Sequence, residues 1–152
     1  MFKPDSIRPI ALGIAKKGNK ILVGIGYDKV KKQTFYRALG GGIEFGETSK
    51  DAIKREFQEE ILADITVNDL LGVIENIFTY QGKTGHEIVF LYSIEIPEDT
   101  YKDEYEIDDE ADEYNAVWVD IDDFKSGKKI IYPEEFLKYI SVSYTHLTLP
   151  TT

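Results

Sequence analysis

Apolar residues recur along the chain in two different patterns, and each pattern predicts a different element. Alternating or continuous apolar runs bounded by turn residues predict β-strands, and the turns at 17–19 and 81–85 predict two hairpins. Between these hairpins the apolar spacing widens to four or five residues, which predicts an amphipathic helix over about 49–61. The predicted strands are 7–15, 21–26, 35–39, 64–67, 70–80, 86–96 and 116–119.

The last third of the chain contains an acidic segment followed by two predicted short helices. The segment 98–113 is mostly acidic and is predicted to be a loop or a short disordered insert. Two short helices are predicted after it, over 121–126 and 133–140, the second opened by Pro133 in its first turn. Strands that form a mixed sheet, with one helix in the middle of the chain and others near its end, indicate an α/β or α+β domain.

Three glutamates stand out on the predicted central helix. Glu56, Glu59 and Glu60 have i, i+3 and i+4 spacing and therefore share one face. The like-charged pair Glu56 and Glu60 would cost roughly 0.2–0.5 kcal/mol on an exposed helix. A divalent ion would turn the same face into a set of hard oxygen ligands of the kind that Mg²⁺ or Mn²⁺ accepts together with phosphates.

A glycine loop leads into this helix. Gly40–Gly42 follow the strand 35–39, and Gly46 precedes Thr48, which forms a capping-box start with Asp51. A strand, a glycine loop and a helix in this order let backbone groups approach a phosphate or a metal closely.

Composition narrows the classes of function. The 152 residues include 28 acidic and 18 basic ones, for a formal net charge of −10, which argues against extended nucleic-acid binding because that needs a basic surface. A nucleotide held through a divalent ion stays compatible, since the ion supplies positive charge. The chain has no cysteine, hence no disulfide framework and no thiolate nucleophile. No apolar signal region and no membrane-length run are seen, so a cytoplasmic protein without membrane partners is the default expectation.

The stretch 41–63 resembles the Nudix box, G-x5-E-x7-R-E-U-x-E-E-x-G-U, in which U is aliphatic. Its first glycine and all its charged positions match at the required spacing, at Gly41, Glu47, Arg55, Glu56, Glu59 and Glu60. Two positions depart, with Phe57 at an aliphatic position and Leu62 in place of the second glycine. Leucine disfavours the left-handed conformation by roughly 1–2 kcal/mol, so a changed helix end is expected there and catalysis is expected to survive.

The resemblance implies a fold, a chemistry and a set of roles. The fold would be the Nudix α/β/α sandwich with a mixed β-sheet and a loop-helix-loop catalytic box. The activity would be hydrolysis, dependent on Mg²⁺ or Mn²⁺, of a nucleoside diphosphate linked to another moiety. The glutamates at 56, 59 and 60 would bind metal together with the carbonyl of Gly41 or Gly42, and one of them would act as the base. Family members are often dimers, so a homodimer is a further expectation.

The remaining box residues have two interpretations. Arg55 and Glu47 are expected to form an ion pair that locks the loop to the helix. In the alternative, Arg55 contacts a phosphate of the substrate.

Residues outside the box carry weaker signals. Arg37 alternates with Tyr36 on its strand and either binds phosphate or is solvated. Glu87 is an extra metal ligand, a general base or an exposed acid at a strand end. His86 either stacks on a base or binds phosphate, or simply lies on the surface. Several aromatic residues are candidates for base stacking or for the core: Tyr27, Phe35, Phe45, Phe78 and Tyr80.

Two other functions fit parts of the pattern. A metal–nucleotide binding or sensor module without turnover would need no base, which the intact glutamates argue against. An isomerase of isoprenoid diphosphates, in the family's known form, would need a catalytic cysteine. The box leaves the substrate open among oxidised nucleoside triphosphates, ADP-ribose or other nucleotide sugars, dinucleoside polyphosphates and capped RNA ends.

The end of the chain has its own interpretation. Residues 142–151 resemble a translated sequencing adapter, so 142–152 is predicted to be a non-native tail and 1–141 a single domain. The alternative is a genuine polar tail without function.

Overall fold

The computed structural model describes residues 5–109 and 112–140. Within these residues the strands are β1 (Ile7–Lys17), β2 (Lys20–Asp28), β3 (Gln33–Gly42), β4 (Thr66–Tyr80), β5 (Lys83–Glu95), β6 (Glu104–Asp109) and β7 (Asp112–Asp120). The helices are α1 (Ser49–Ile61), α2 (Ile121–Lys125) and α3 (Phe136–Ile140), with a 3-10 turn η1 at Glu98–Thr100.

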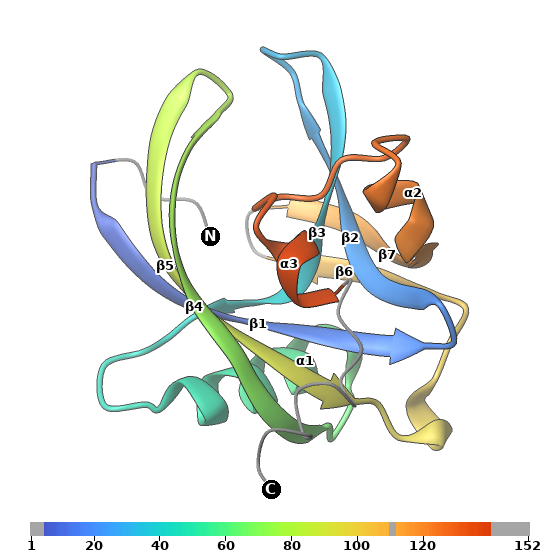
Figure 1. Cartoon of the computed structure of the whole chain (residues 1–152). Coiled ribbons are helices and arrows are strands. Elements are labelled where there is room, and N and C mark those ends of the chain that lie inside the picture. The colour runs from blue at the N-terminus through green and yellow to red at the C-terminus, as the bar shows by residue number, and fades with distance from the viewer. Residues whose placement is uncertain (1–4, 110–111, 141–152) are drawn as a thin grey trace, which may run out of the picture.

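The described strands form one mixed sheet in the order β4-β5-β1-β3-β2-β7-β6. β1 and β5 run parallel, from Ile7 opposite His86 to Ala15 opposite Ile94, and the other neighbours are antiparallel. β3 pairs with β1 at one end and with β2 at the other. The β4–β5 and β2–β3 hairpins therefore leave the centre of the sheet as two separate arms, as Figure 1 shows.

Helices cover both faces of the sheet (Figure 1). The face that packs on α1 buries the apolar stripe predicted from the sequence, formed by Ala52, Ile53, Phe57 and Ile61. The opposite face packs on α2 and α3 through Phe124, Phe136 and Ile140. This is the predicted α/β/α sandwich.

Phe57, the aromatic departure from the box, is fully buried. A Cβ atom at Gly13 of β1 would lie 2.9 Å from the Cε1 atom of this ring, so glycine at position 13 leaves the space that an aromatic side chain needs. Burying a ring of this size contributes about 2–3 kcal/mol, and the aromatic residue therefore serves the same packing role as an aliphatic one.

Helix α1 is capped at both ends by hydrogen bonds from backbone amides. The Thr48 hydroxyl accepts a hydrogen bond from the amide of Asp51 at 3.1 Å, as the capping pattern predicts. At the other end, Leu62 adopts the left-handed conformation, with φ 56° and ψ 34°. Its amide donates to the carbonyl of Gln58 at 3.1 Å and that of Ala63 donates to Phe57 at 3.4 Å. The expected change of the helix end is wrong, because these bonds satisfy the last carbonyls and the leucine side chain projects into solvent.

The acidic segment corrects a second expectation. Residues 104–109 form β6, and β6 pairs with β7, whereas composition predicted a loop or a disordered insert. Tyr105 and Ile107 are each only 2% exposed, and exposed acidic residues alternate with them. Burial of these two alternating side chains therefore determines the structure of the segment despite its acidic charge.

None of the helices in the described part of the chain has the length and apolarity needed to span a bilayer. The predicted tail at 142–152 lies outside the described residues.

Candidate active site

A cleft of about 1200 Å³ opens between the two arms of the sheet. Its inner end is lined by Gly40 and Gly41 of the box loop, and its outer part by aromatic side chains from both arms and from the segment before α3. These aromatic residues are Tyr27, Phe35, Phe78, Tyr80 and Tyr132. The cleft is somewhat larger than typical small-molecule sites, which measure roughly 300–1000 Å³ and are mostly apolar with a few polar groups.

Phe35 joins the two sides of the aromatic group. Its ring centre lies 5.9 Å from that of Tyr80 in an edge-on arrangement and 5.7 Å from that of Tyr132. Four of the five aromatic residues named as candidates for base stacking therefore line the cleft. Phe45, the fifth, is fully exposed in the loop before α1 and is not among the residues that line it.

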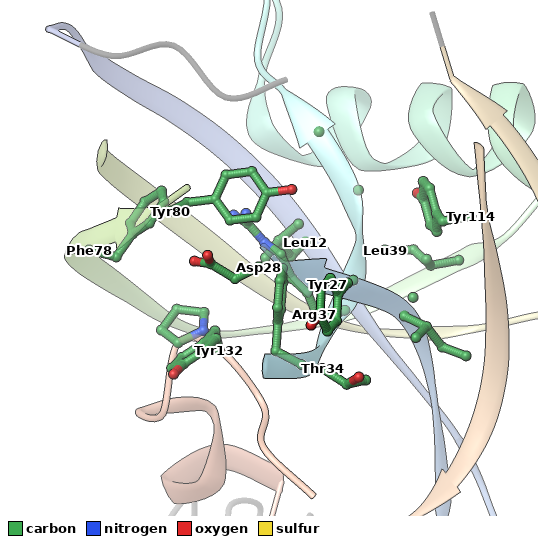
Figure 2. Close-up of a pocket in the computed structure, with 18 of the residues that line it drawn as sticks. Leu12, Tyr27, Asp28, Thr34, Arg37, Leu39, Phe78, Tyr80, Tyr114 and Tyr132 are labelled. Atoms are coloured by element: carbon green, nitrogen blue, oxygen red, sulfur yellow. The ribbon is translucent and has the colours of Figure 1, made fainter. Parts of the chain in front are cut away.

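Asp28 fastens the two arms together at the outer part of the cleft. Its side chain accepts hydrogen bonds from the amides of Val30 at 2.9 Å and Lys31 at 3.0 Å, both in its own turn. It also accepts one from the amide of Gln81, at 3.1 Å, in the turn of the other hairpin. Figure 2 shows Asp28 among Phe78, Tyr80 and Tyr132.

These amide donors explain the electrostatics of Asp28. The hydrogen bond from Lys31 is the largest of the effects that lower the pKa of the Asp28 carboxyl, although burial opposes it. The sequence analysis missed this residue. An aspartate before a turn is a local signal, but its bond to Gln81 depends on the tertiary arrangement.

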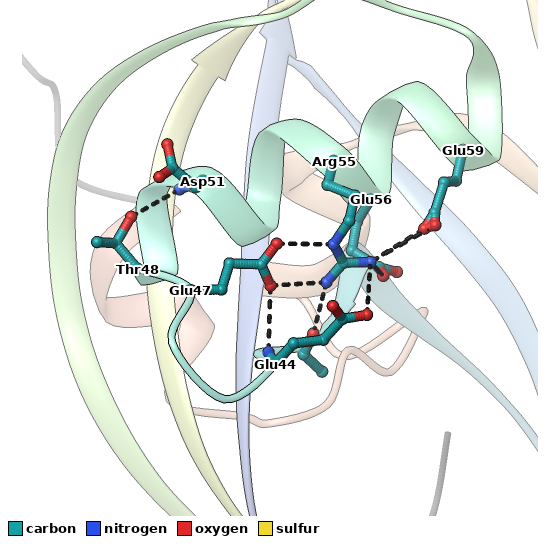
Figure 3. Close-up of polar contacts among 8 residues, drawn as sticks. Glu44, Glu47, Thr48, Asp51, Arg55, Glu56 and Glu59 are labelled. Atoms are coloured by element: carbon teal, nitrogen blue, oxygen red, sulfur yellow. Dashed lines mark hydrogen bonds and ion pairs between the residues drawn. The ribbon is translucent and has the colours of Figure 1, made fainter.

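Arg55 is the centre of the polar network at the box (Figure 3). Its Nε and Nη2 atoms donate to the two carboxylate oxygens of Glu47 at 2.8 and 2.9 Å. Nη2 also donates to the carbonyl of Gly42 at 2.9 Å. Nη1 donates to Glu56 at 2.6 Å and to Glu59 at 3.0 Å. Each guanidinium nitrogen thus has an acceptor within the loop and helix, which favours a locking role over the alternative of contacting phosphate.

Glu47 links this network back to the loop. Its Oε1 atom accepts a hydrogen bond from the amide of Glu44 at 3.1 Å. The pKa of Glu47 is lowered, chiefly by the hydrogen bonds from Arg55. The carboxylate is therefore held in its charged form, which maintains the ion pair.

Glu56 lies closest to the glycine loop. A Cβ atom at Gly41 would lie 2.2 Å from its Oε1 atom, so only glycine lets the loop backbone approach this carboxylate. Burial raises the pKa of Glu56, and Arg55 partly offsets that effect. A carboxylate removed from water beside a second acidic residue would gain from an added cation.

The other two helix carboxylates differ in their surroundings. The Glu59 side chain is 54% exposed and contacts Arg55. Glu60 is less exposed and accepts a hydrogen bond from the hydroxyl of Tyr114 on β7 at 3.0 Å. Sequence reasoning missed Tyr114, which lies 54 positions away along the chain. A Cβ atom at Gly24 would lie 2.7 Å from its ring, so that glycine makes room for it.

The donor set fits a hard divalent cation. The carboxylates of Glu56, Glu59 and Glu60 share one side of α1, and the glycine loop approaches that side without a Cβ atom in the way. In this conformation no three acidic or histidine side chains of the described residues gather as a finished metal centre. Arg55 contacts two of the carboxylates, and Tyr114 binds the third.

The structure places the candidate residues outside the box in different surroundings. Arg37 lines the cleft and donates to Glu87 of β5 at 2.5 Å. Glu87 is 3% exposed, so the interpretation as an exposed acid at a strand end is wrong. His86 pairs with the exposed Glu75 at 3.0 Å and is not among the residues that line the cleft.

Solved structures share this fold at low sequence identity. A NUDIX hydrolase from Nitrosomonas europaea aligns with a TM-score of 0.66 and 17% identity, over 90% of this chain and 87% of that one. A dihydroneopterin triphosphate pyrophosphohydrolase from E. coli aligns with 0.61 and 14%, over 92% and 95%. An ADP-ribose pyrophosphatase from Streptococcus suis aligns with 0.58 and 13%, over 88% of each chain.

Comparison of the sequence itself gives the family. No curated protein matches the chain significantly. The family described as NUDIX domain matches residues 9–140, which include the box, the helix α1 and both arms of the cleft. This match confirms the predicted fold and the predicted class of enzyme, a hydrolase acting on phosphoric anhydride bonds. The chain therefore belongs to the NUDIX domain family.

Proposed function

We propose that this protein is a divalent-metal-dependent pyrophosphohydrolase that cleaves a diphosphate bond in a nucleoside diphosphate linked to another moiety. The observation that carries the proposal is the continuity of one cleft, with the box glycines at one end and aromatic rings at the other. A substrate with a diphosphate and a planar ring system matches both ends. The aromatic surface supplies stacking, and the box supplies oxygen donors.

The box residues divide the chemical work. The carboxylates of Glu56, Glu59 and Glu60, with the carbonyl of Gly41, would hold Mg²⁺ or Mn²⁺, which neutralises phosphate charge and acidifies water when bound. Glu59 or Glu60 accepts the proton of the attacking water as general base, a contribution of about 10²–10⁴ in rate.

Two further residues keep the box in shape. Glu47 and Arg55 hold the loop against the helix through their paired hydrogen bonds. They act through the carboxylates that they position.

A turnover screen tests the proposal. The purified protein is incubated with ADP-ribose, a UDP-sugar, a dinucleoside polyphosphate, an oxidised nucleoside triphosphate, dihydroneopterin triphosphate and capped RNA, each with and without Mg²⁺ or Mn²⁺. The names of the structural neighbours justify the breadth of this panel, since one is an ADP-ribose pyrophosphatase and another acts on dihydroneopterin triphosphate.

The screen has two informative outcomes. Metal-dependent release of a phosphate-containing product from one substrate class supports the hydrolase and identifies the substrate. Binding of metal and nucleotide by calorimetry, without turnover of any compound, would instead favour the metal–nucleotide binding module. A homodimer and a cytoplasmic location are also proposed, and sedimentation and cell fractionation test them.

A further inference from the structure

A partly buried ion pair joins the two arms near their base. Arg37 comes from β3 and Glu87 from β5, and their side chains meet at 2.5 Å. The Glu87 side chain is 4% exposed, whereas that of Arg37 is 31% exposed and lines the cleft. We propose that Arg37 binds an anionic phosphate group of the substrate and that Glu87 is a positioning residue that holds the guanidinium in place. The inference rests on the proposed function and extends it by assigning both roles.

Stability alone does not explain this pair. Burying the Glu87 carboxylate removes a charge from water, which is costly, and replacing a buried ion pair by apolar residues of similar volume is often neutral or stabilising. The neighbouring residues of β5 on the same face of the strand, such as Val89, are buried and apolar. An apolar pair would therefore fit this position, and a guanidinium directed into a ligand cleft has a separate reason to be there.

The arginine has donors to spare for a ligand. A guanidinium carries five N–H groups. Nη2 of Arg37 is bound to Glu87, and its Nε atom is buried without a hydrogen-bond partner among the described residues. A planar fork with one edge fixed by a carboxylate is pre-organised, so little freedom is lost when the remaining donors bind phosphate oxygens.

A second arginine places this anchor next to the box. Arg8 of β1 also lines the cleft and is the register partner of Glu87 on the adjacent parallel strand. A Cβ atom at Gly42 would lie 2.8 Å from its Nη2 atom, so the Arg8 guanidinium reaches the box loop. In a chain with a net charge of −10, Arg8 and Arg37 bring two cationic groups to the part of the cleft beside the box loop, and cationic groups in a cleft attract anionic ligands.

This assignment differs from the sequence-based alternatives for Glu87. A general base or an additional metal ligand would need its carboxylate to be accessible to water or to the ion. In the structure the carboxylate is buried and engaged by Arg37. The two roles predict different kinetics, because loss of a base lowers kcat, whereas loss of an anchor acts mainly on KM.

The test uses Arg37→Gln, Glu87→Gln and the double variant in the full chain. KM and kcat are measured on the best substrate of the screen with Mg²⁺. Arg37→Gln is expected to raise KM roughly 10–100-fold, the usual effect of losing hydrogen bonds to a charged group, with a smaller change in kcat. Glu87→Gln is expected to change KM several-fold when Arg37 is present. When Arg37 is already replaced, adding Glu87→Gln should change KM by less than about twofold relative to Arg37→Gln alone. Such non-additive effects are expected if Glu87 acts only through Arg37.

Controls and a second measurement keep the result clear. Lys125→Gln on α2 and Glu75→Gln on β4 remove one exposed charge of each sign outside the cleft, and their KM should equal that of the wild type. The double variant replaces the ion pair by two neutral amides and leaves no unpaired buried charge, so a result remains if Arg37→Gln fails to fold. Calorimetry with ADP in the absence of metal measures binding affinity independently of turnover. Weaker ADP binding by Arg37→Gln than by the wild type supports the phosphate anchor even if the screen finds no activity.

Two outcomes would overturn the assignment. An unchanged KM and an unchanged ADP affinity in Arg37→Gln would remove the phosphate anchor. A loss of kcat of about 10²-fold in Glu87→Gln, equally with and without Arg37 and with the acidic limb of the pH profile abolished, would show that Glu87 is the general base.

Discussion

Leucine at position 62 should cost the protein stability that glycine would restore. Leu62 has φ 56° and a side chain that is 72% exposed. The left-handed conformation costs an L-residue roughly 1–2 kcal/mol. Glycine avoids that cost but loses about 0.4–1 kcal/mol through the larger freedom of its unfolded chain.

The comparison with alanine isolates this backbone effect. Leu62→Ala removes the same side-chain contacts as Leu62→Gly but keeps the Cβ atom. The glycine variant should therefore be more stable than the alanine variant by about 1 kcal/mol, which corresponds to about 2–4 °C in Tm for a domain of this size. Its gain over the wild type should be smaller, because the leucine side chain keeps some packing.

Urea unfolding, followed by the signal of Trp118 and by circular dichroism, measures these differences. Leu62→Asn should lie between alanine and glycine, because asparagine tolerates the left-handed region. The kcat value should be the same in all variants, since the Leu62 side chain is apolar and mostly exposed and is not one of the proposed metal ligands. Equal stability of the alanine and glycine variants, or a more stable alanine variant, would refute the reasoning.

Three other perturbations follow from the site. Arg55→Ala should lower the free energy of unfolding by at least about 2 kcal/mol, because the partly buried carboxylates of Glu47 and Glu56 lose their cation; an unchanged urea midpoint would contradict this. Gly41→Ala should lower kcat at least about tenfold by displacing Glu56, and full activity would show that the close approach is unimportant. Asp28→Asn should be less stable than the wild type at pH 7. Because the Asp28 pKa is lowered on folding, its stabilisation is present above the ordinary value of 3.8 and is lost as the pH falls through the lowered value. The difference in urea midpoint should shrink over that range, and a constant difference would argue against the ionised carboxylate.

The sequence predicted the central helix and the box closely, because their signals are local. The Thr48 cap, the apolar stripe and the glutamate spacing all lie within a few turns of one helix, and α1 spans Ser49–Ile61 as predicted. The acidic composition of the segment 98–113 predicts a loop, whereas the alternation of Tyr105 and Ile107, which are buried, determines its structure.

The contacts that shape the cleft could not be predicted in the same way. The bond from Tyr114 to Glu60 joins residues 54 positions apart, that from Gln81 to Asp28 spans 53, and that from Arg37 to Glu87 spans 50. The last two bonds join the β2–β3 arm to the β4–β5 arm, and the first joins β7 to α1, so each depends on the tertiary arrangement. No local pattern encodes that arrangement. Of the six residues, Glu60, Arg37 and Glu87 are candidates from the sequence alone, but their partners in these bonds are not predicted.

The most direct test of the central claim is kcat for the wild type, Glu59→Gln and Glu60→Gln on the substrate found by the screen, at saturating Mg²⁺. These variants keep the shape of the side chain and remove its charge. The account predicts that at least one loses about 10²-fold or more in kcat, with an unchanged circular dichroism spectrum. Wild-type turnover in both variants would contradict the claim that the carboxylates of this helix carry the hydrolysis.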